Sequence, residues 1–228
     1  YKAVGYLNPA PRVAGELYFV HRIPSDPVLA EFFVLDSRSH RKRKGSDQTL
    51  LGEQQEEELL RWLVSSPAKW KFIVSSVMFS DFGLNWGKSE HERLAMSDNW
   101  SVWPEDRKRV LDVAKTVPGT ILLSGDVHYN AITMHGDCLP EITSSPLASV
   151  PIPLASHAAV EGDQTMLFNF TSSSTYCSLD IGYEAVVANF YKHDPPPKQA
   201  ALDGAKGSTT LVKSHVFKDN CGSDNEEL

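Results

Sequence analysis

Asp126 and His128 carry metal-binding chemistry and follow directly after an apolar run of the sequence. They lie in TILLSGDVHYNAIT (120–133), which becomes polar at Ser124. If Val127 turns inward, residues 126 and 128 face the same side. A hard carboxylate oxygen and an imidazole nitrogen on one side can form part of a site for a divalent or trivalent cation. The alternative interpretation is an aspartate that caps a turn beside a hydrogen-bonded histidine.

Alternating strand and helix patterns in the first half of the chain would position this pair. The predicted order is a strand over 30–36, a helix over 51–66, a strand over 71–79, a helix from Pro104 to 117 and a strand over 120–126. This order predicts an α/β fold with parallel neighbours in the sheet and helices on at least one face. In such open sheets ligands bind beyond the carboxyl ends of the strands, which is where residues 126 and 128 come.

The second half of the chain has short runs separated by turn residues, a pattern typical of mainly antiparallel strands. The predicted strands fall in 131–147, 165–173, 175–183, 184–191 and 209–217. A surface loop over 150–163 and a linker over 193–207 connect these strands, and a frayed tail over 219–228 follows them. In the first half of the chain, a long loop over 80–103 is predicted to be functional.

Composition excludes several classes of protein. The net charge of −7 over 228 residues argues against general nucleic-acid binding. No apolar run approaches the roughly 18 residues that span a bilayer, so no integral membrane segment is expected. Three cysteines without pair spacing, and no leader pattern after Tyr1, favour an intracellular location.

Five blocks of sequence, taken in order, resemble the PhoD-like alkaline phosphatase family of the calcineurin-like metallophosphoesterases. The blocks are FFVLDSRSHR (32–41), LGEQQEEELLRWL (51–63), DNWSVWPEDRKRVL (98–111), LLSGDVHYNAI (122–132) and PEITSSPL (140–147). The resemblance is best over 28–147, and the later strands, in 148–192 and 208–218, are assigned to the same domain. It implies a four-layer α/β-β/α sandwich that hydrolyses phosphate monoesters or diesters of small molecules or phospholipids.

The resemblance also implies a binuclear metal centre, with Asp126 at a calcium-type position and His128 at an iron-type position. Zinc and manganese are alternative metals. The family's other ligands lie in blocks of the types GDxxYxD and WDDHD, and neither block occurs here. The sequence therefore resembles the C-terminal half of a PhoD-like enzyme, and the missing N-terminal part would complete the site. We expect the isolated chain to be inactive; the alternative is a non-catalytic binding or scaffold protein with a degenerate phosphatase fold.

Three further residues match the family's blocks and are candidates for substrate binding. Arg38, in the LDxRxxR block, either contacts phosphate or braces the sheet edge, and the bracing role is favoured. Asp98 and Trp100, in the DxW block, either form part of a lid or pack the long loop onto the core. Glu141 and the hydroxyls of 143–145 follow on the next strand, where they either approach phosphate or are ordinary strand-end residues.

Overall fold

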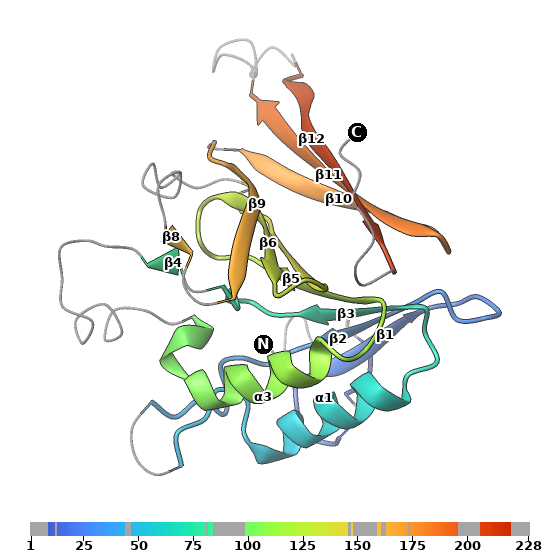
Figure 1. The fold of residues 1–228 in the computed structure, drawn as a ribbon, viewed down its shortest axis with the longest axis vertical. Coiled ribbons are helices and arrows are strands. Elements are labelled where there is room, and N and C mark those ends of the chain that lie inside the picture. The colour runs from blue at the N-terminus through green and yellow to red at the C-terminus, as the bar shows by residue number, and fades with distance from the viewer. Residues whose placement is uncertain are drawn as a thin grey trace.

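A mixed seven-stranded sheet forms the centre of the computed structural model of the chain (Figure 1). The structure describes residues 9–11, 13–43, 47–80, 82–83, 99–145, 147, 159–160, 163–172, 174–195 and 206–219. The strands lie in the order β1 (Phe19–Ile23), β2 (Ala30–Val34), β3 (Trp70–Val74), β5 (Thr120–Ser124), β7 (Leu139–Thr143), β6 (Asn130–His135) and β9 (Gln164–Phe170). Strands β2, β3, β5 and β7 are parallel, and the others join them antiparallel.

Helices α1 (Glu53–Ser65) and α3 (Pro104–Ala114) cover one face of this sheet (Figure 1). Leu59 and Trp62 of α1 and Val110 of α3 are buried in one apolar core with Phe33 and Leu122 of the sheet. Both helices carry acidic residues in their first turn, where the helix dipole favours negative charge. Pro104 at the first position of α3 has the fixed φ that a helix start needs.

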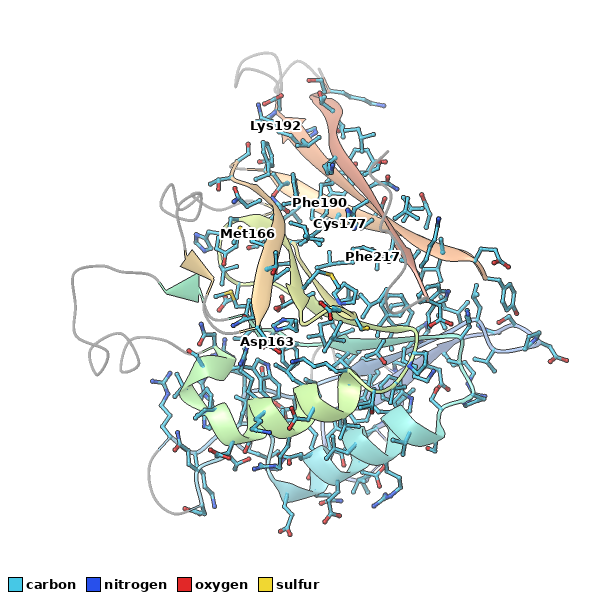
Figure 2. All side chains as sticks on the ribbon, in the orientation of Figure 1. Asp163, Met166, Cys177, Phe190, Lys192 and Phe217 are labelled. Carbon is cyan, nitrogen blue, oxygen red and sulfur yellow. The ribbon has the colours of Figure 1, made fainter. Side chains whose placement is uncertain are left out.

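The other face of the sheet is covered by a second, three-stranded antiparallel sheet. It consists of β10 (Thr175–Ile181), β11 (Ala185–Asp194) and β12 (Ser208–Lys218). Figure 2 labels Cys177, Phe190 and Phe217 of this sheet, which pack in a second core with Phe72 and Ile121 of the central sheet. The described residues therefore form three layers: helices, the seven-stranded sheet and the three-stranded sheet. Two short strands, β4 (Phe82–Gly83) and β8 (Ala159–Val160), pair apart from these layers.

The structure confirms the predicted α/β fold with parallel neighbours, helical cover and mainly antiparallel later strands. It differs from the prediction in that β1 was not expected. Strand β3 also ends at Val74 rather than at residue 79, because the Ser75 hydroxyl donates a hydrogen bond to the Val77 carbonyl at 2.6 Å and closes a turn.

Smaller corrections concern the predicted linker and tail. His193 and Asp194, predicted to belong to the linker, are the last residues of β11. Asp219, predicted to belong to the frayed tail, forms an ion pair with Lys69. Most of the predicted loop over 150–163 lies outside the described residues.

Glu31 on β2 is a buried carboxylate that should make folding sensitive to acid. It accepts hydrogen bonds from Trp62 Nε1 at 2.9 Å, Arg22 Nε at 2.7 Å and the Ser66 hydroxyl at 2.5 Å. Burial raises the pKa of Glu31, but these donors outweigh burial, and the net pKa lies below its usual 4.5.

A lowered pKa in the folded state means that the unfolded chain binds the proton more tightly. The contribution of Glu31 is therefore present above about pH 4.5 and is lost as the pH falls through the lower folded value. We expect Glu31→Gln to be less stable than wild type at pH 7, with the difference shrinking below pH 4. Urea unfolding across this pH range measures it, and a constant difference would contradict the assignment.

None of the helices in the described part of the chain is long and apolar enough to cross a membrane.

Candidate functional site

The carboxyl ends of the four parallel strands meet at one edge of the central sheet. Hydrogen bonds continue the pairing past the strand ends, from Leu35 N to Val74 O and from Ser75 N to Leu123 O, each at 2.9 Å. Ser144 N likewise donates to Ser124 O at 3.0 Å. The segments that follow β2, β3, β5 and β7 therefore leave the sheet side by side, and this is the edge at which α/β folds bind ligands.

Asp126 and His128 follow β5 at this edge in an uncommon backbone conformation. Their φ angles are +73° and +58°, and they are the only non-glycine residues with positive φ in the described ranges. The left-handed region costs an L-residue roughly 1–2 kcal/mol, so such residues persist only where the surrounding structure imposes the conformation. Two strained residues, both with metal-binding side chains, mark this turn as a candidate functional site.

Packing and hydrogen bonds on both sides hold the strained turn. Val127 packs against a small buried cluster that includes Met78, Tyr129 and Ala131. The backbone N–H of His128 donates to the Ser145 hydroxyl at 3.3 Å. Asp126 remains accessible, with 51% of its side chain exposed, and His128 is half-buried. The pair is therefore neither sealed in the core nor left on a freely moving loop.

Arg38 lies beside Asp126. Its Nη2 atom is 3.9 Å from Asp126 Oδ2, although helix α1, strand β3 and helix α3 lie between the two residues in the sequence. The Arg38 backbone N–H donates to Asp36 Oδ1 at 3.0 Å, and the Gln55 amide fixes the Asp36 backbone in both directions, at 2.8 and 3.0 Å. Arg38 is therefore placed at the same edge as Asp126 by a braced turn.

Trp100 lies in the core. Its side chain is fully buried, stacks on Phe79 at 4.4 Å between ring centroids, and donates from Nε1 to the Ser75 hydroxyl at 3.1 Å. Of its two predicted roles, this geometry agrees with packing of the loop onto the core, and a fully buried indole has no surface for substrate. Asp98 lies outside the described residues.

The donor chemistry of Asp126 and His128 suits two ligands of a metal site, an oxygen and a nitrogen. Within the described ranges, no three His, Cys, Asp or Glu side chains are grouped so that they could hold a metal ion. These residues fit a partial site and do not form a complete one.

A buried polar network lies below the strained turn, and its centre is Glu141 on β7. Glu141 is fully buried and accepts hydrogen bonds from the Phe79 and Ser80 backbone N–H groups, each at 2.8 Å, and from the Ser124 hydroxyl at 2.6 Å. The Ser80 hydroxyl also donates to it, and His135 Nε2 lies 2.9 Å from Oε2. Burial alone would raise the pKa of Glu141, but these partners bring it below its usual value.

This network was not predicted from the sequence, which placed Glu141 on the right strand without a partner. A glutamate flanked by Pro140 and Ile142 in the strand LPEIT was the available signal, because a charged residue in a central strand needs internal partners. Full burial excludes direct contact between Glu141 and a substrate.

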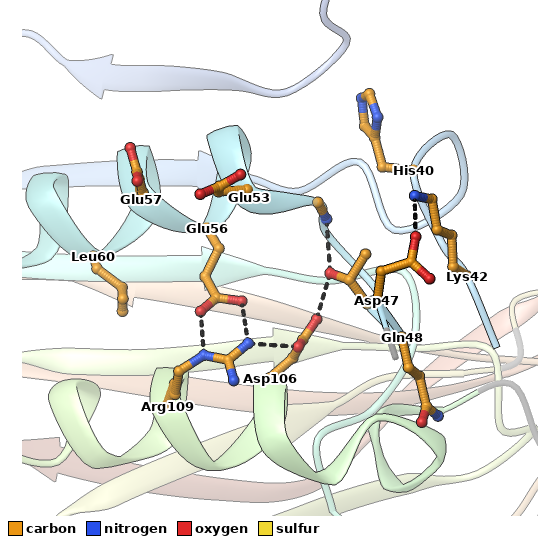
Figure 3. A pocket seen from close by; sticks show the side chains of 12 residues that line it. His40, Lys42, Asp47, Gln48, Glu53, Glu56, Glu57, Leu60, Asp106 and Arg109 are labelled. Atoms are coloured by element: carbon orange, nitrogen blue, oxygen red, sulfur yellow. Dashed lines mark hydrogen bonds and ion pairs between the residues drawn. The ribbon is translucent and has the colours of Figure 1, made fainter. Parts of the chain in front are cut away.

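A pocket of about 540 Å³ lies between α1, α3 and residues of the segments 40–42 and 47–52 (Figure 3). Arg109 of α3 binds Glu56 of α1 through two nitrogens, and its Nη2 also lies 2.6 Å from Asp106 (Figure 3). The other lining residues include Asp47, Glu53 and Glu57. Because carboxylates dominate the lining, this pocket would repel a phosphate ester, and we assign Arg109 to bracing the two helices.

Comparisons with known proteins agree with this fold. The family model of PhoD-like phosphatase matches residues 19–188. Alkaline phosphatase D of Bacillus subtilis (strain 168) is 32% identical over 126 residues, covering 48% of this chain and 21% of that protein.

A solved structure, titled "Structure of PhoD", superposes with a TM-score of 0.64 at 18% identity. The match covers 90% of this chain and 42% of that one, so the chain spans less than half the length of either relative. At this identity the second likeness concerns the fold alone. The family model matches more than half of the residues of this chain, and the chain therefore belongs to the PhoD-like phosphatase family.

Proposed function

We propose that the chain contributes part of the site of a metal-dependent phosphoesterase. The reaction is the hydrolysis of phosphate monoesters or diesters, and Asp126 and His128 are the metal ligands that this chain supplies. The family resemblance favours a calcium-type position for Asp126 and an iron-type position for His128, with zinc or manganese as alternatives.

One observation supports this proposal above the others: the left-handed backbone of both Asp126 and His128 at the carboxyl edge of the parallel strands. A turn that needed only to connect β5 to β6 would be more stable with glycine or asparagine at these positions. Strain at two accessible residues with ligand chemistry is better explained by a requirement for their side chains.

The chemistry of the site follows from its charges. A pair of metal ions about 4 Å apart can polarise a phosphate ester and supply the nucleophile for in-line attack. Arg38, 3.9 Å from Asp126, supplies a guanidinium that can bind two phosphate oxygens at once. The role proposed for Arg38 is therefore to bind substrate at the sheet edge where Asp126 and His128 lie. The proposed substrate is a phosphate ester of a small molecule or a phospholipid.

One carboxylate, from Asp126, and one imidazole, from His128, are too few ligands to hold a binuclear centre. We therefore propose that this chain is the C-terminal part of the catalytic domain. A preceding part of the same polypeptide would supply the remaining ligands and the fourth layer of the sandwich. The chain's coverage of 42% of the PhoD structure is consistent with this proposal.

Hydrolysis of p-nitrophenyl phosphate and bis(p-nitrophenyl) phosphate tests the proposed function. We expect the 228-residue chain alone to show no metal-dependent turnover with calcium, iron, zinc or manganese. The polypeptide extended by the preceding coding sequence should be active and should lose activity with a chelator. Turnover that survives metal removal would contradict the proposal.

The second candidate is a non-catalytic binding or scaffold protein that keeps the family's fold. The absence of a three-ligand group among the described residues favours it. The same assay separates the two candidates, because an extended polypeptide that binds no metal and hydrolyses neither ester would support the scaffold.

A further inference from the structure

Glu141 joins the ends of two strands that the candidate site depends on. Phe79 and Ser80, whose N–H groups it binds, lie in the segment that follows β3. Ser124, whose hydroxyl it also binds, is the last residue of β5 and lies two residues before Asp126. One carboxylate thus fixes the separation between the segment after β3 and the start of the strained turn.

The cost of this arrangement indicates that it serves more than stability. A carboxylate without solvent contact loses its hydration, and replacement of buried ionic groups by apolar ones is often neutral or stabilising. Leu139, two residues earlier on the same face of β7, is apolar and buried in the core with the helices, so an apolar side chain could also occupy this face. What an apolar side chain could not do is bind Ser124, Ser80 and His135 together.

We infer that Glu141 is a positioning residue that acts through Ser124 to hold Asp126 and His128 in their left-handed conformation. The Ser124 hydroxyl donates to Glu141 and lies 2.9 Å from the Thr143 hydroxyl, so it is held from β7 by two side chains. The Ser124 carbonyl accepts from Ser144 N at 3.0 Å. With Ser124 fixed by both side chain and backbone, the turn that contains Asp126 and His128 begins from a fixed position and direction at the end of β5. The inference rests on the proposed function insofar as the positioned residues are metal ligands.

Ser124→Ala separates this role from general stability, and Thr120→Val is its matched control. Both residues belong to β5, at opposite ends, and each would lose a hydroxyl; that of Thr120 donates to the Val117 carbonyl at 2.7 Å. The network of Glu141 with Phe79, Ser80 and His135 remains in Ser124→Ala, so the variant should fold.

Two measurements on the full 228-residue chain give the readout. The first is amide hydrogen exchange by NMR. Ser124→Ala should speed exchange at residues 125–130 about tenfold relative to wild type, whereas Thr120→Val should leave these amides unchanged. Unchanged exchange at 125–130 in Ser124→Ala, or faster exchange throughout the chain, would overturn the positioning role.

The second measurement is the broadening of the His128 ring signals by Mn²⁺. Loss of a group that orients a metal ligand typically weakens binding by 10–100-fold, so Ser124→Ala should need at least about tenfold more Mn²⁺ for equal broadening. If wild type is broadened and Ser124→Ala is broadened equally at the same Mn²⁺ concentration, the inference is overturned. If wild type shows no broadening, in this chain and in the extended polypeptide, the proposed metal function fails, and the exchange experiment still decides the positioning role.

Discussion

Asp126→Asn in the active, extended polypeptide should lower phosphoesterase turnover by at least about 100-fold without lowering the melting temperature. The estimate is a lower bound, because loss of groups that only orient a ligand already costs 10–100-fold. Asparagine keeps the size of the side chain and tolerates positive φ better than most residues, so the turn at φ +73° remains possible. What the variant loses is the negative charge that would hold a cation.

His128→Asn tests the second ligand by the same reasoning. The φ of His128 is +58°, a value that asparagine also adopts readily, while the imidazole nitrogen is removed. We expect a similar loss of turnover, together with a lower metal content in the purified protein. The combined variant should be little worse than either one, because ligands of one centre act as a unit.

Asp137→Asn is the matched control for both variants. Asp137 is an exposed aspartate in the turn between β6 and β7, and β7 begins at the opposite end of the sheet from the candidate site. Its substitution should leave turnover within about twofold of wild type. Near-normal turnover in both site variants would refute the ligand assignment, and unfolding of either variant would show that the side chains are needed for the turn itself.

The position of the candidate site could be predicted because its signal is local in sequence. The apolar run that ends at Ser124-Gly125-Asp126 predicts a strand and the position of its carboxyl end. In α/β folds ligands bind beyond the carboxyl ends of the strands, so the polar residues there were candidates for function. The left-handed conformation of Asp126 and His128 had no such signal, because even aspartate and histidine, which adopt it more often than most non-glycine residues, do so in a small minority of cases.

The partners of the site depended on contacts between distant segments. The approach of Arg38 to Asp126 requires the strand order β2-β3-β5, and the burial of Glu141 requires β6 and the turn after β3 as neighbours. Trp100 shows the same limit, since its sequence context allowed both a lid and a core position. Pairing order and burial are properties of the whole sheet, which a single run of residues does not specify.

Glu141→Ala should be the most destabilising single substitution in the candidate site. The change removes the acceptor of the Phe79 and Ser80 backbone N–H groups. It also removes one partner each from the Ser80 and Ser124 hydroxyls and from His135. Each buried donor that is left unsatisfied typically costs about 1–3 kcal/mol, so the loss of several together should cost about 3–5 kcal/mol. For a chain of this size, each kcal/mol lowers the melting temperature by about 2–4 °C, so a fall of about 10 °C is expected.

Glu141→Gln distinguishes the loss of charge from the loss of volume. Glutamine keeps one oxygen, but its NH₂ group meets the donors that faced the second carboxylate oxygen, so we expect a loss of about 2 kcal/mol or more. Glu57→Ala, at an exposed glutamate of α1, is the control and should stay within about 0.5 kcal/mol of wild type. Thermal and urea unfolding measure all three variants. If Glu141→Ala were as stable as Glu57→Ala, the carboxylate would not organise the strand ends, and the left-handed turn above it would need another cause.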